Sequence, residues 1–262
     1  MGCATQLLDR AAGYARGLLK NMIDRITPTL RPHRPLAGWQ SWRDLLFLHW
    51  PVPVAMLQGL IPKDLTLDLF EGQAYVGLVP FTMQQVRPRY WPKILSFNFL
   101  ETNVRTYVHY QSKDPGVYFF SLEAASRLAV WAARRFWSLP YHFAKMTMEK
   151  TERRIQYTSI RKNNPEVGLE LSYEIREDLG VSLPGSFEHF LLERYLLYSE
   201  HRGVLQRGQV HHLPYPVRSA KILQMKESLL EAAGILVDTS KVPIAHYSSG
   251  VDVEIFALKA VV

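Results

Sequence analysis

The stretch LETNVRTYVHYQSKDPGVYFFSLEA, residues 100–124, carries the strongest fold signal in the chain. Residues 101–110 and 116–123 combine β-branched and aromatic side chains, which favour strands. The QSKDPG between them has the composition of a turn. Because strands joined by a short turn run antiparallel, we predict an antiparallel strand pair here.

The rest of the chain repeats this pattern of short strands separated by turn residues. Apolar and polar positions alternate over residues 145–176, as in half-buried antiparallel strands. The strand–helix–strand alternation of a parallel sheet is absent. We therefore predict an α+β fold, in which an antiparallel sheet curves into a barrel with a few peripheral helices. The helices predicted in this domain cover residues 53–62, 126–137, 186–199 and 227–233.

Residues 1–38 are predicted to form an N-terminal extension. In residues 4–27, Leu and Ile recur at helical spacing between Arg and Lys, which indicates a basic amphipathic helix. The following TPTLRPHRPLAG contains three prolines and indicates an extended tether. Such a helix either lies on a membrane surface or docks on its own domain or on a partner chain, and we favour docking. The main domain is expected to cover residues 39–262.

The composition is that of a soluble globular protein, with 47% hydrophobic and 21% charged residues. The net charge is +7, but the basic residues are scattered and match no nucleic-acid-binding motif, so no nucleic-acid partner is expected. The single cysteine, Cys3, excludes a disulfide framework within the chain. Without a long apolar run or a signal-peptide pattern, the protein is expected to be cytoplasmic. The sequence leaves open whether it forms a homo-oligomer.

Several well-known cofactor and catalytic motifs are missing. The chain contains no GxGxxG, no GxxxxGK[ST], no HExxH and no GxSxG pattern. His211 and His212 are adjacent, so on a strand they would point to opposite faces and would not bind one metal together. We therefore expect neither a cofactor nor a metal site.

A polar strand face is the first candidate site. In the strand predicted over residues 101–110, Glu101, Asn103, Arg105 and Tyr107 share one face because side chains alternate along a strand. Two interpretations remain open. The face is either exposed to solvent, with an incidental ion pair, or it lines the interior of the barrel and holds charges ready for a polar ligand.

A second candidate lies after the helix predicted over residues 126–137, where Tyr141 and His142 follow Pro140. A histidine near neutral pH can accept or donate a proton, and a tyrosine hydroxyl can donate a hydrogen bond. The alternative is a core tyrosine beside a histidine whose ring nitrogens are hydrogen-bonded.

Seven segments in order resemble a known family. They are LLFLHWPVP, YVGLVPFTM, ETNVRTYV, GVYFFSLEA, LPYHFAKM, FLLERYLLY and SSGVDVEIF. Together they resemble the DUF2071 family, which includes the YqjF-like proteins, from about Trp42 to Val261. That family is functionally uncharacterised and is similar in fold to acetoacetate decarboxylase. The resemblance implies a cone-shaped antiparallel β-barrel with helices around it and a pocket inside.

The same resemblance suggests roles for individual residues. The NRE segment of the decarboxylases corresponds to WRD here and places Arg43 on their active-site arginine, while YTESG corresponds to LETNV and places Glu101 on a catalytic glutamate. Their Schiff-base lysine falls on Tyr141 and its neighbouring lysine on His142. Neither side chain can form an imine. The nearest following amine, on Lys145, would lie about 10 Å further along the strand. The resemblance therefore implies a pocket without the decarboxylase chemistry.

Three hypotheses of function follow, and the first is a small-molecule-binding barrel. Arg43 and Arg105 would clamp a small anionic metabolite, such as a carboxylate or keto acid, and Glu101 would pair with them. The other predicted lining residues are Asn103, Tyr118, Trp137, Tyr141 and His142.

The second hypothesis is an enzyme that needs no imine, such as a lyase, hydratase or tautomerase. His142 and Glu101 would exchange protons with the substrate, and Tyr141 would donate a hydrogen bond to an oxyanion. The third is a membrane-surface or scaffold protein that acts through the helix at residues 4–27. The sequence does not decide whether the protein is an enzyme.

Overall fold

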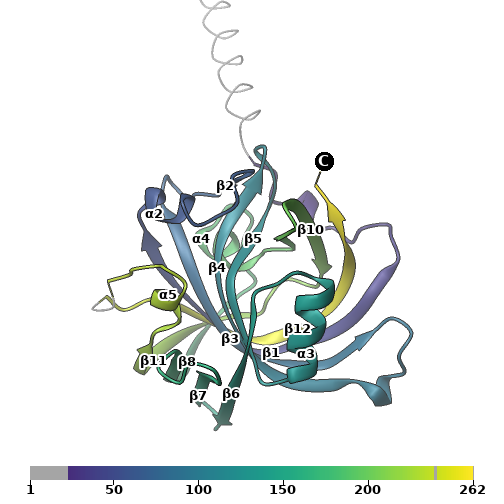
Figure 1. Cartoon of the computed structure of the whole chain (residues 1–262). Coiled ribbons are helices and arrows are strands. Elements are labelled where there is room, and N and C mark those ends of the chain that lie inside the picture. The colour runs from purple at the N-terminus through teal and green to yellow at the C-terminus, as the bar shows by residue number, and fades with distance from the viewer. Residues whose placement is uncertain (1–22, 239–240, 262) are drawn as a thin grey trace, which may run out of the picture.

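A long, branched antiparallel sheet dominates the computed structural model, which describes residues 23–238 and 241–261 (Figure 1). All named strands belong to a single 12-stranded sheet. The strands are β1 (Leu36–Val52), β2 (Leu65–Leu67), β3 (Ala74–Pro88), β4 (Phe97–Tyr110), β5 (Lys113–Ala124), β6 (Tyr141–Lys150), β7 (Arg154–Arg161), β8 (Gly168–Gly180), β9 (Leu196–His201), β10 (Val204–His211), β11 (Val217–Glu227) and β12 (Ile244–Ala260).

Short helices connect these strands. They are the 3-10 turns η1 (Thr27–Thr29) and η2 (Lys93–Leu95) and the helices α2 (Val54–Gln58), α3 (Arg127–Phe136), α4 (Phe187–Leu192) and α5 (Leu229–Ala232). Helices α2, α3 and α5 were predicted, with longer bounds. The described residues contain no helix long and apolar enough to cross a membrane.

The sheet closes on itself, and this closure produces the curved, cone-like architecture. The predicted strand pair is confirmed: β4 and β5 are antiparallel, with Glu101 opposite Ala124. One ring of paired strands runs from β5 through β6, β7, β8, β11, β12, β1 and β3 back to β4. A second ring runs from β5 through β9 and β10 to β12. From β12 it returns to β5 through β1, β3 and β4, which both rings contain. Both branches from β5 begin with parallel pairs, to β6 and to β9.

Residues 45–50 of β1 are buried on both faces of the sheet, which explains the apolar run LLFLHW. Leu45 and Phe47 point into one core, which we call the α4 core because it contains Phe190 of that helix. Leu46 and Leu48 point into a second core, enclosed with residues of β7 and β8. Each face of β1 therefore contributes to a different ring.

The predicted helix over residues 186–199 is wrong in its second half. Ser186 caps α4 by accepting a hydrogen bond from the His189 amide at 3.2 Å. The helix ends at Leu192, and Glu193 leaves helical geometry at φ −86° and ψ 82°. Its carboxylate accepts hydrogen bonds from the Tyr215 amide at 2.9 Å and the Tyr195 hydroxyl at 2.7 Å. These long-range contacts redirect the chain into β9 despite helical periodicity.

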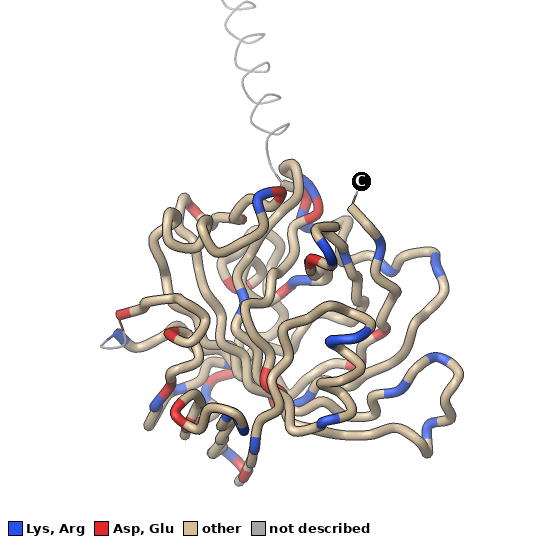
Figure 2. The backbone as a smooth tube through the Cα atoms, in the orientation of Figure 1, with Lys and Arg blue, Asp and Glu red and all other residues tan. Residues whose placement is uncertain are grey.

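Most of the helix predicted over residues 4–27 lies outside the described residues. Residues 23–26, which are described, are not helical, and they pack against the domain. Arg25 donates two hydrogen bonds to Asp68, at 2.5 and 2.6 Å. Pro28 is buried, and Arg31 pairs with Glu254 of β12 at 2.6 Å. The proline-rich segment therefore lies on the domain and leads into β1 at Leu36. Figure 2 shows basic and acidic positions interleaved along the chain.

Candidate functional site

The polar face predicted on β4 lies in the interior. Glu101, Asn103, Arg105 and Tyr107 are 2%, 5%, 9% and 0% exposed. Tyr107 is part of the α4 core, and strand alternation places the other three on its side of the sheet. The sequence left open whether this face is exposed to solvent or faces the interior, and in the structure it faces the interior.

Glu101 and Tyr141 meet at one end of this face. In the sheet, Glu101 of β4 lies opposite Ala124 of β5, which lies opposite Phe143 of β6. The Tyr141 hydroxyl donates a hydrogen bond to Glu101 Oε2 at 2.7 Å. Burial raises the pKa of Glu101 to about 8, although the Tyr141 bond opposes the rise. Glu101 is therefore largely a neutral carboxylic acid at pH 7.

This raised pKa predicts a pH-dependent stability that Glu101→Gln should remove. Below its ordinary pKa of 4.5 the carboxyl is neutral in both folded and unfolded chains. From pH 4.5 to about 8, unfolding releases its proton, so the contribution of Glu101 to stability falls as pH rises and levels above pH 8. The one-proton slope is about 1.4 kcal/mol per pH unit. Urea unfolding at pH 5, 6, 7 and 8 should show a flatter profile for Glu101→Gln than for the wild type.

A matched control is Glu149→Gln, because Glu149 is an exposed glutamate on β6, the strand that carries Tyr141. Its pH profile should follow that of the wild type. Parallel profiles for all three proteins would contradict a neutral Glu101 in the folded state.

Arg105 lies farther along the same face and is an unpaired buried cation. Its Nη2 donates only one long hydrogen bond, to the Leu191 carbonyl at 3.4 Å, and its Nε has no partner among the described residues. No described carboxylate lies within ion-pair distance of this guanidinium. The guanidinium carbon lies 5.5 Å from the Phe47 ring centre and 5.8 Å from that of Tyr107. Two residues earlier, the buried Asn103 Oδ1 also lacks a partner.

His49 is a buried polar residue next to Arg105 that the sequence analysis did not single out. The Tyr107 hydroxyl donates to the Leu191 carbonyl at 2.8 Å and lies 2.6 Å from His49 Nε2. Because that hydroxyl proton is used, His49 must donate from Nε2, which leaves the Nδ1 lone pair unpartnered. Burial and then the charge of Arg105 lower the pKa of His49 well below 6.5. The only sequence signal was one histidine in an apolar strand.

A buried network of charged residues, Arg194, Asp68 and Arg25, also lies beside the α4 core. Arg194 donates to Asp68 at 2.6 Å, and Asp68 also binds Arg25. The Arg194 guanidinium carbon lies 4.4 Å from the Phe190 ring centre and 4.7 Å from that of Tyr107. Neither Arg194 nor Asp68 was among the site residues predicted from the sequence.

The predicted His142 points away from Tyr141 because successive strand residues alternate. Its backbone neighbour across the sheet is Glu123, which binds Arg161 at 2.6 Å. Burial, followed by the charges of Arg161 and Arg134, lowers the pKa of His142 to about 4. The structure therefore separates His142 from the Glu101–Tyr141 pair. Lys145, on the same strand, is exposed.

The remaining predicted residues occupy three different places. Arg43 pairs with Asp252 and donates to the Trp42 and Val251 carbonyls, so its fork is already occupied. Trp137 packs in the small apolar cluster that contains Tyr141. Tyr118 packs against the core on the other side of the sheet. Only Trp137 of these three lies beside the Glu101–Tyr141 pair.

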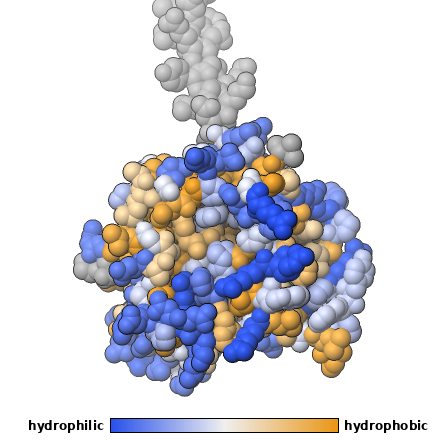
Figure 3. Space-filling view, viewed as in Figure 1, coloured by the Kyte–Doolittle hydropathy of each residue, from blue (hydrophilic) through white to orange (hydrophobic). Residues whose placement is uncertain are grey.

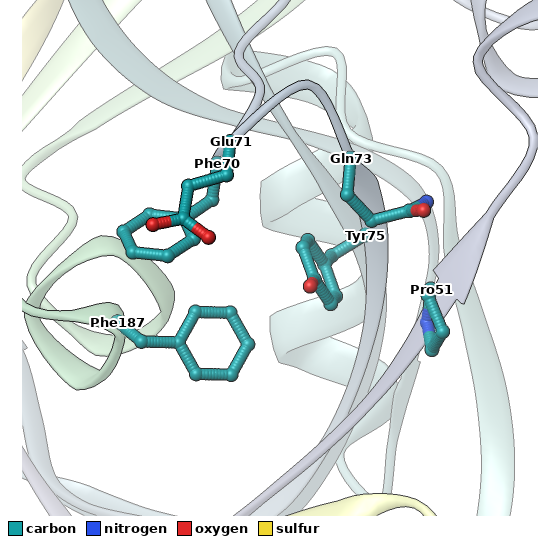
Figure 4. A pocket seen from close by; sticks show the side chains of 6 residues that line it. All are labelled: Pro51, Phe70, Glu71, Gln73, Tyr75 and Phe187. Atoms are coloured by element: carbon teal, nitrogen blue, oxygen red, sulfur yellow. The ribbon is translucent and has the colours of Figure 1, made fainter.

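Two pockets lie at the surface rather than on the polar face. One, of about 290 Å³, opens where β5 exchanges its neighbour β9 for β6. It is lined by Leu60, Tyr118, Phe119, Phe120, Ser138, Leu139, Pro140, Tyr198, Ser199 and Glu200. Figure 4 shows the other, a more open pocket of about 510 Å³ that lies between three aromatic rings. It is lined by Pro51, Phe70, Glu71, Gln73, Tyr75 and Phe187.

No cluster of three or more metal-binding side chains occurs within residues 23–238 and 241–261. The chemistry offered by the interior is an unpaired guanidinium, an amide oxygen and a neutral carboxyl held by a tyrosine.

Comparison with known proteins bears on both fold and family. The model of DUF2071, described as an uncharacterized conserved protein, matches residues 39–252. The uncharacterized protein YqjF of Bacillus subtilis (strain 168) is 40% identical over 221 residues, which cover 84% of this chain and 90% of that protein.

Solved structures match at the level of the fold. The enduracididine biosynthesis enzyme MppR complexed with pyruvate has a TM-score of 0.62 at 11% identity, covering 87% of this chain and 91% of that one. Acetoacetate decarboxylase from Legionella pneumophila has a TM-score of 0.58 at 11% identity, covering 90% and 92%. At such identities the likeness establishes an acetoacetate decarboxylase-like fold and nothing about activity.

Proposed function

The chain belongs to the DUF2071 family, and from this membership and its interior polar face we propose that it binds a small carboxylate or keto acid at Arg105 without forming a Schiff base. The single observation that carries the proposal is the unpaired, buried guanidinium of Arg105. A buried charge without a counterion is costly, so a site that retains one is suited to an anion that arrives from outside.

The donor geometry of Arg105 suits a carboxylate. Nε has no partner and Nη2 makes only a 3.4 Å bond, so the Nε–Nη2 edge is available for two parallel hydrogen bonds. The buried carboxylates of the α4 core are engaged elsewhere, Asp68 with two arginines and Glu193 with Tyr195 and Tyr215. Neither would compete with the ligand for this edge.

The groups farther along β4 suggest what else the ligand carries. The unpartnered Oδ1 of Asn103 can accept a hydrogen bond, and Glu101 beyond it is a neutral acid that can donate one. A ligand with a carboxylate at one end and a carbonyl or hydroxyl toward the other matches this order. Because Glu101 lies about 13 Å along the strand from Arg105, a small acid bound at Arg105 reaches Asn103 before Glu101. The complex of the similarly folded MppR with pyruvate is consistent with a ligand of this class.

A thermal-shift experiment tests the proposal. Pyruvate and acetoacetate at pH 7 should raise the melting temperature of the full chain, whereas the uncharged pyruvamide and acetone should not. At a concentration 100 times Kd the expected stabilisation is about 2.7 kcal/mol, which corresponds to roughly 5–10 °C for a domain of this size. Sodium chloride at matched ionic strength is the control. A failure of a broad panel of small carboxylates to shift the melting temperature would overturn the proposal.

Proton transfer without an imine is a second candidate, favoured by the pKa of about 8 at Glu101. A carboxyl that is protonated near neutral pH can act as a general acid, and the Tyr141 hydroxyl can support the charge that develops on it. The originally predicted partner, His142, belongs to the opposite face, so this candidate rests on Glu101 and Tyr141 alone. Deuterium exchange at the carbon next to the keto group of a bound keto acid, followed by NMR, distinguishes turnover from binding.

A further inference from the structure

A separate surface carries large apolar side chains that face solvent. The loop from Pro88 to Ser96, between β3 and β4, exposes Ile94 by 89% and Tyr90 by 87%. Helix α3 exposes Phe136 by 62% and Trp131 by 59%. The full set is Tyr90, Trp91, Ile94, Leu95, Leu128, Trp131 and Phe136. Exposed apolar groups gathered in this way mark an interaction surface.

These two segments are neighbours in the fold. The loop leads into β4, whose first residues Phe97 and Phe99 stack with ring centres 5.8 Å apart. Phe99 packs in the same apolar cluster as Val130 and Ala133 of α3. Figure 1 shows α3 and the β3–β4 hairpin on one side of the molecule, and Figure 3 shows hydrophobic side chains at the tip on that side. We call residues 87–96 and 127–136 together the basic–apolar surface.

The charge of the basic–apolar surface has one sign. The two segments contain no Asp or Glu, and their cations are Arg87, Arg89, Lys93, Arg127, Arg134 and Arg135. Within the described part of the chain, none of the six forms an ion pair. Instead, the Arg89 guanidinium lies over the Tyr90 ring at 5.4 Å and that of Arg135 over Phe136 at 5.6 Å. The surface thus combines unpaired cations with aromatic rings.

Several contacts fix helix α3, which carries the exposed Trp131 and Phe136 side chains, to the rest of the domain. Ser126 caps its first turn, and Val130 faces the interior. Arg134 Nε donates to the Tyr141 carbonyl at 2.6 Å, which joins the end of the helix to β6. On the outer side, Trp131 meets Phe136 edge to face at 5.8 Å. The exposed rings therefore belong to a fixed element.

We propose that the basic–apolar surface docks on an anionic lipid membrane. Trp, Tyr, Leu and Ile side chains insert into the interface between headgroups and acyl chains, while Arg and Lys contact lipid phosphates and carboxylates. A second copy of this chain fits less well, because a symmetric contact would bring the six unpaired cations of one protomer against the same six of the other. This inference is independent of the predicted helix at residues 4–27 and of the ligand proposal.

Vesicle co-sedimentation of the full chain tests this docking surface. The wild type should bind vesicles of phosphatidylcholine with 30% phosphatidylserine, and binding should weaken in pure phosphatidylcholine or in 0.5 M salt (about 4 Å Debye length). The double variant Ile94→Ser, Trp131→Ser should bind at least about tenfold more weakly, because both side chains are removed from the membrane interface.

The matched control is Leu213→Ser, Val242→Ser, which removes two apolar side chains that are 76% and 81% exposed elsewhere. It should bind like the wild type, and all three proteins should unfold at the same temperature. Equal vesicle binding by all three proteins would overturn the proposal and place membrane contact elsewhere in the chain. An absence of vesicle binding by the wild type would also overturn the proposal. If the wild type is a dimer and only the double variant Ile94→Ser, Trp131→Ser is a monomer, the surface is a contact between subunits.

Discussion

Replacing Asp68 by asparagine is expected to lower the free energy of unfolding by about 3–5 kcal/mol, because it leaves a buried arginine without its counterion. Asp68 and the Arg194 side chain are 1% and 3% exposed and lie 2.6 Å apart. Arg25 adds a second contact from the N-terminal segment, at 2.5 Å. An asparagine keeps the shape but offers one neutral acceptor to two guanidinium groups. Urea unfolding at pH 7 measures the loss, which corresponds to a melting temperature lower by roughly 10 °C.

The matched control for this variant is Asp114→Asn. Asp114 pairs with Arg207, but the two side chains are 42% and 34% exposed. Solvent screens such a pair, so the expected loss is below about 1 kcal/mol. Equal losses for the two variants would contradict the structural importance of the buried network.

The pH dependence gives an independent check on Asp68→Asn. Burial alone would raise the pKa of Asp68, but Arg194 and Arg25 hold it below its ordinary value of 3.8. The stability contributed by this carboxylate is therefore complete above pH 3.8 and is lost as pH falls through the lower, folded-state pKa. The difference in stability between wild type and Asp68→Asn should consequently shrink in acid. A constant difference down to pH 2 would mean that the substitution acts by another route.

The sheet was predictable from local patterns because alternation and turn composition act within a few residues. The pair of strands around QSKDPG is an example. The end of α4 was not predictable in the same way, since the periodicity of FLLERYLLY is helical throughout. The chain departs from the helix because the Glu193 carboxylate binds the Tyr215 amide, 22 residues away. Contacts of that range leave no local signature.

The candidate site shows the same limit. Strand alternation correctly grouped Glu101, Asn103 and Arg105 on one face. The expected pairing of Glu101 with Arg105 does not occur, because four residues along a strand separate two Cα atoms by about 13 Å. The partner of Glu101 is Tyr141, which reaches it only because β5 lies between β4 and β6. The order of strands in the sheet fixes that contact.

Replacing Arg105 by methionine is expected to abolish ligand stabilisation while raising the stability of the unliganded protein. Methionine fills a similar volume without a charge, and it removes a guanidinium that has no carboxylate partner in the described structure and that donates to the Leu191 carbonyl only at 3.4 Å. Apolar replacement of buried charges is often stabilising, by about 1–4 kcal/mol. The same variant should show no melting-temperature shift with pyruvate or acetoacetate, because the proposed carboxylate clamp is gone.

The matched control, Arg194→Met, makes the same substitution at another buried arginine of the α4 core. Arg194 has a carboxylate partner, Asp68. Removing the Arg194 guanidinium takes this buried ion pair away from Asp68, so the variant should be destabilised by about 3–5 kcal/mol. A gain in stability for Arg105→Met together with a loss for Arg194→Met would show that Arg105 serves a ligand and Arg194 serves the fold. If Arg105→Met instead loses as much stability as Arg194→Met and still responds to carboxylates, then Arg105 is a structural residue and the anion binds elsewhere. The difference between the unfolding free energies of Arg105→Met and Arg194→Met therefore tests directly whether Arg105 serves binding. A buried guanidinium that serves only the fold is expected to have a carboxylate partner.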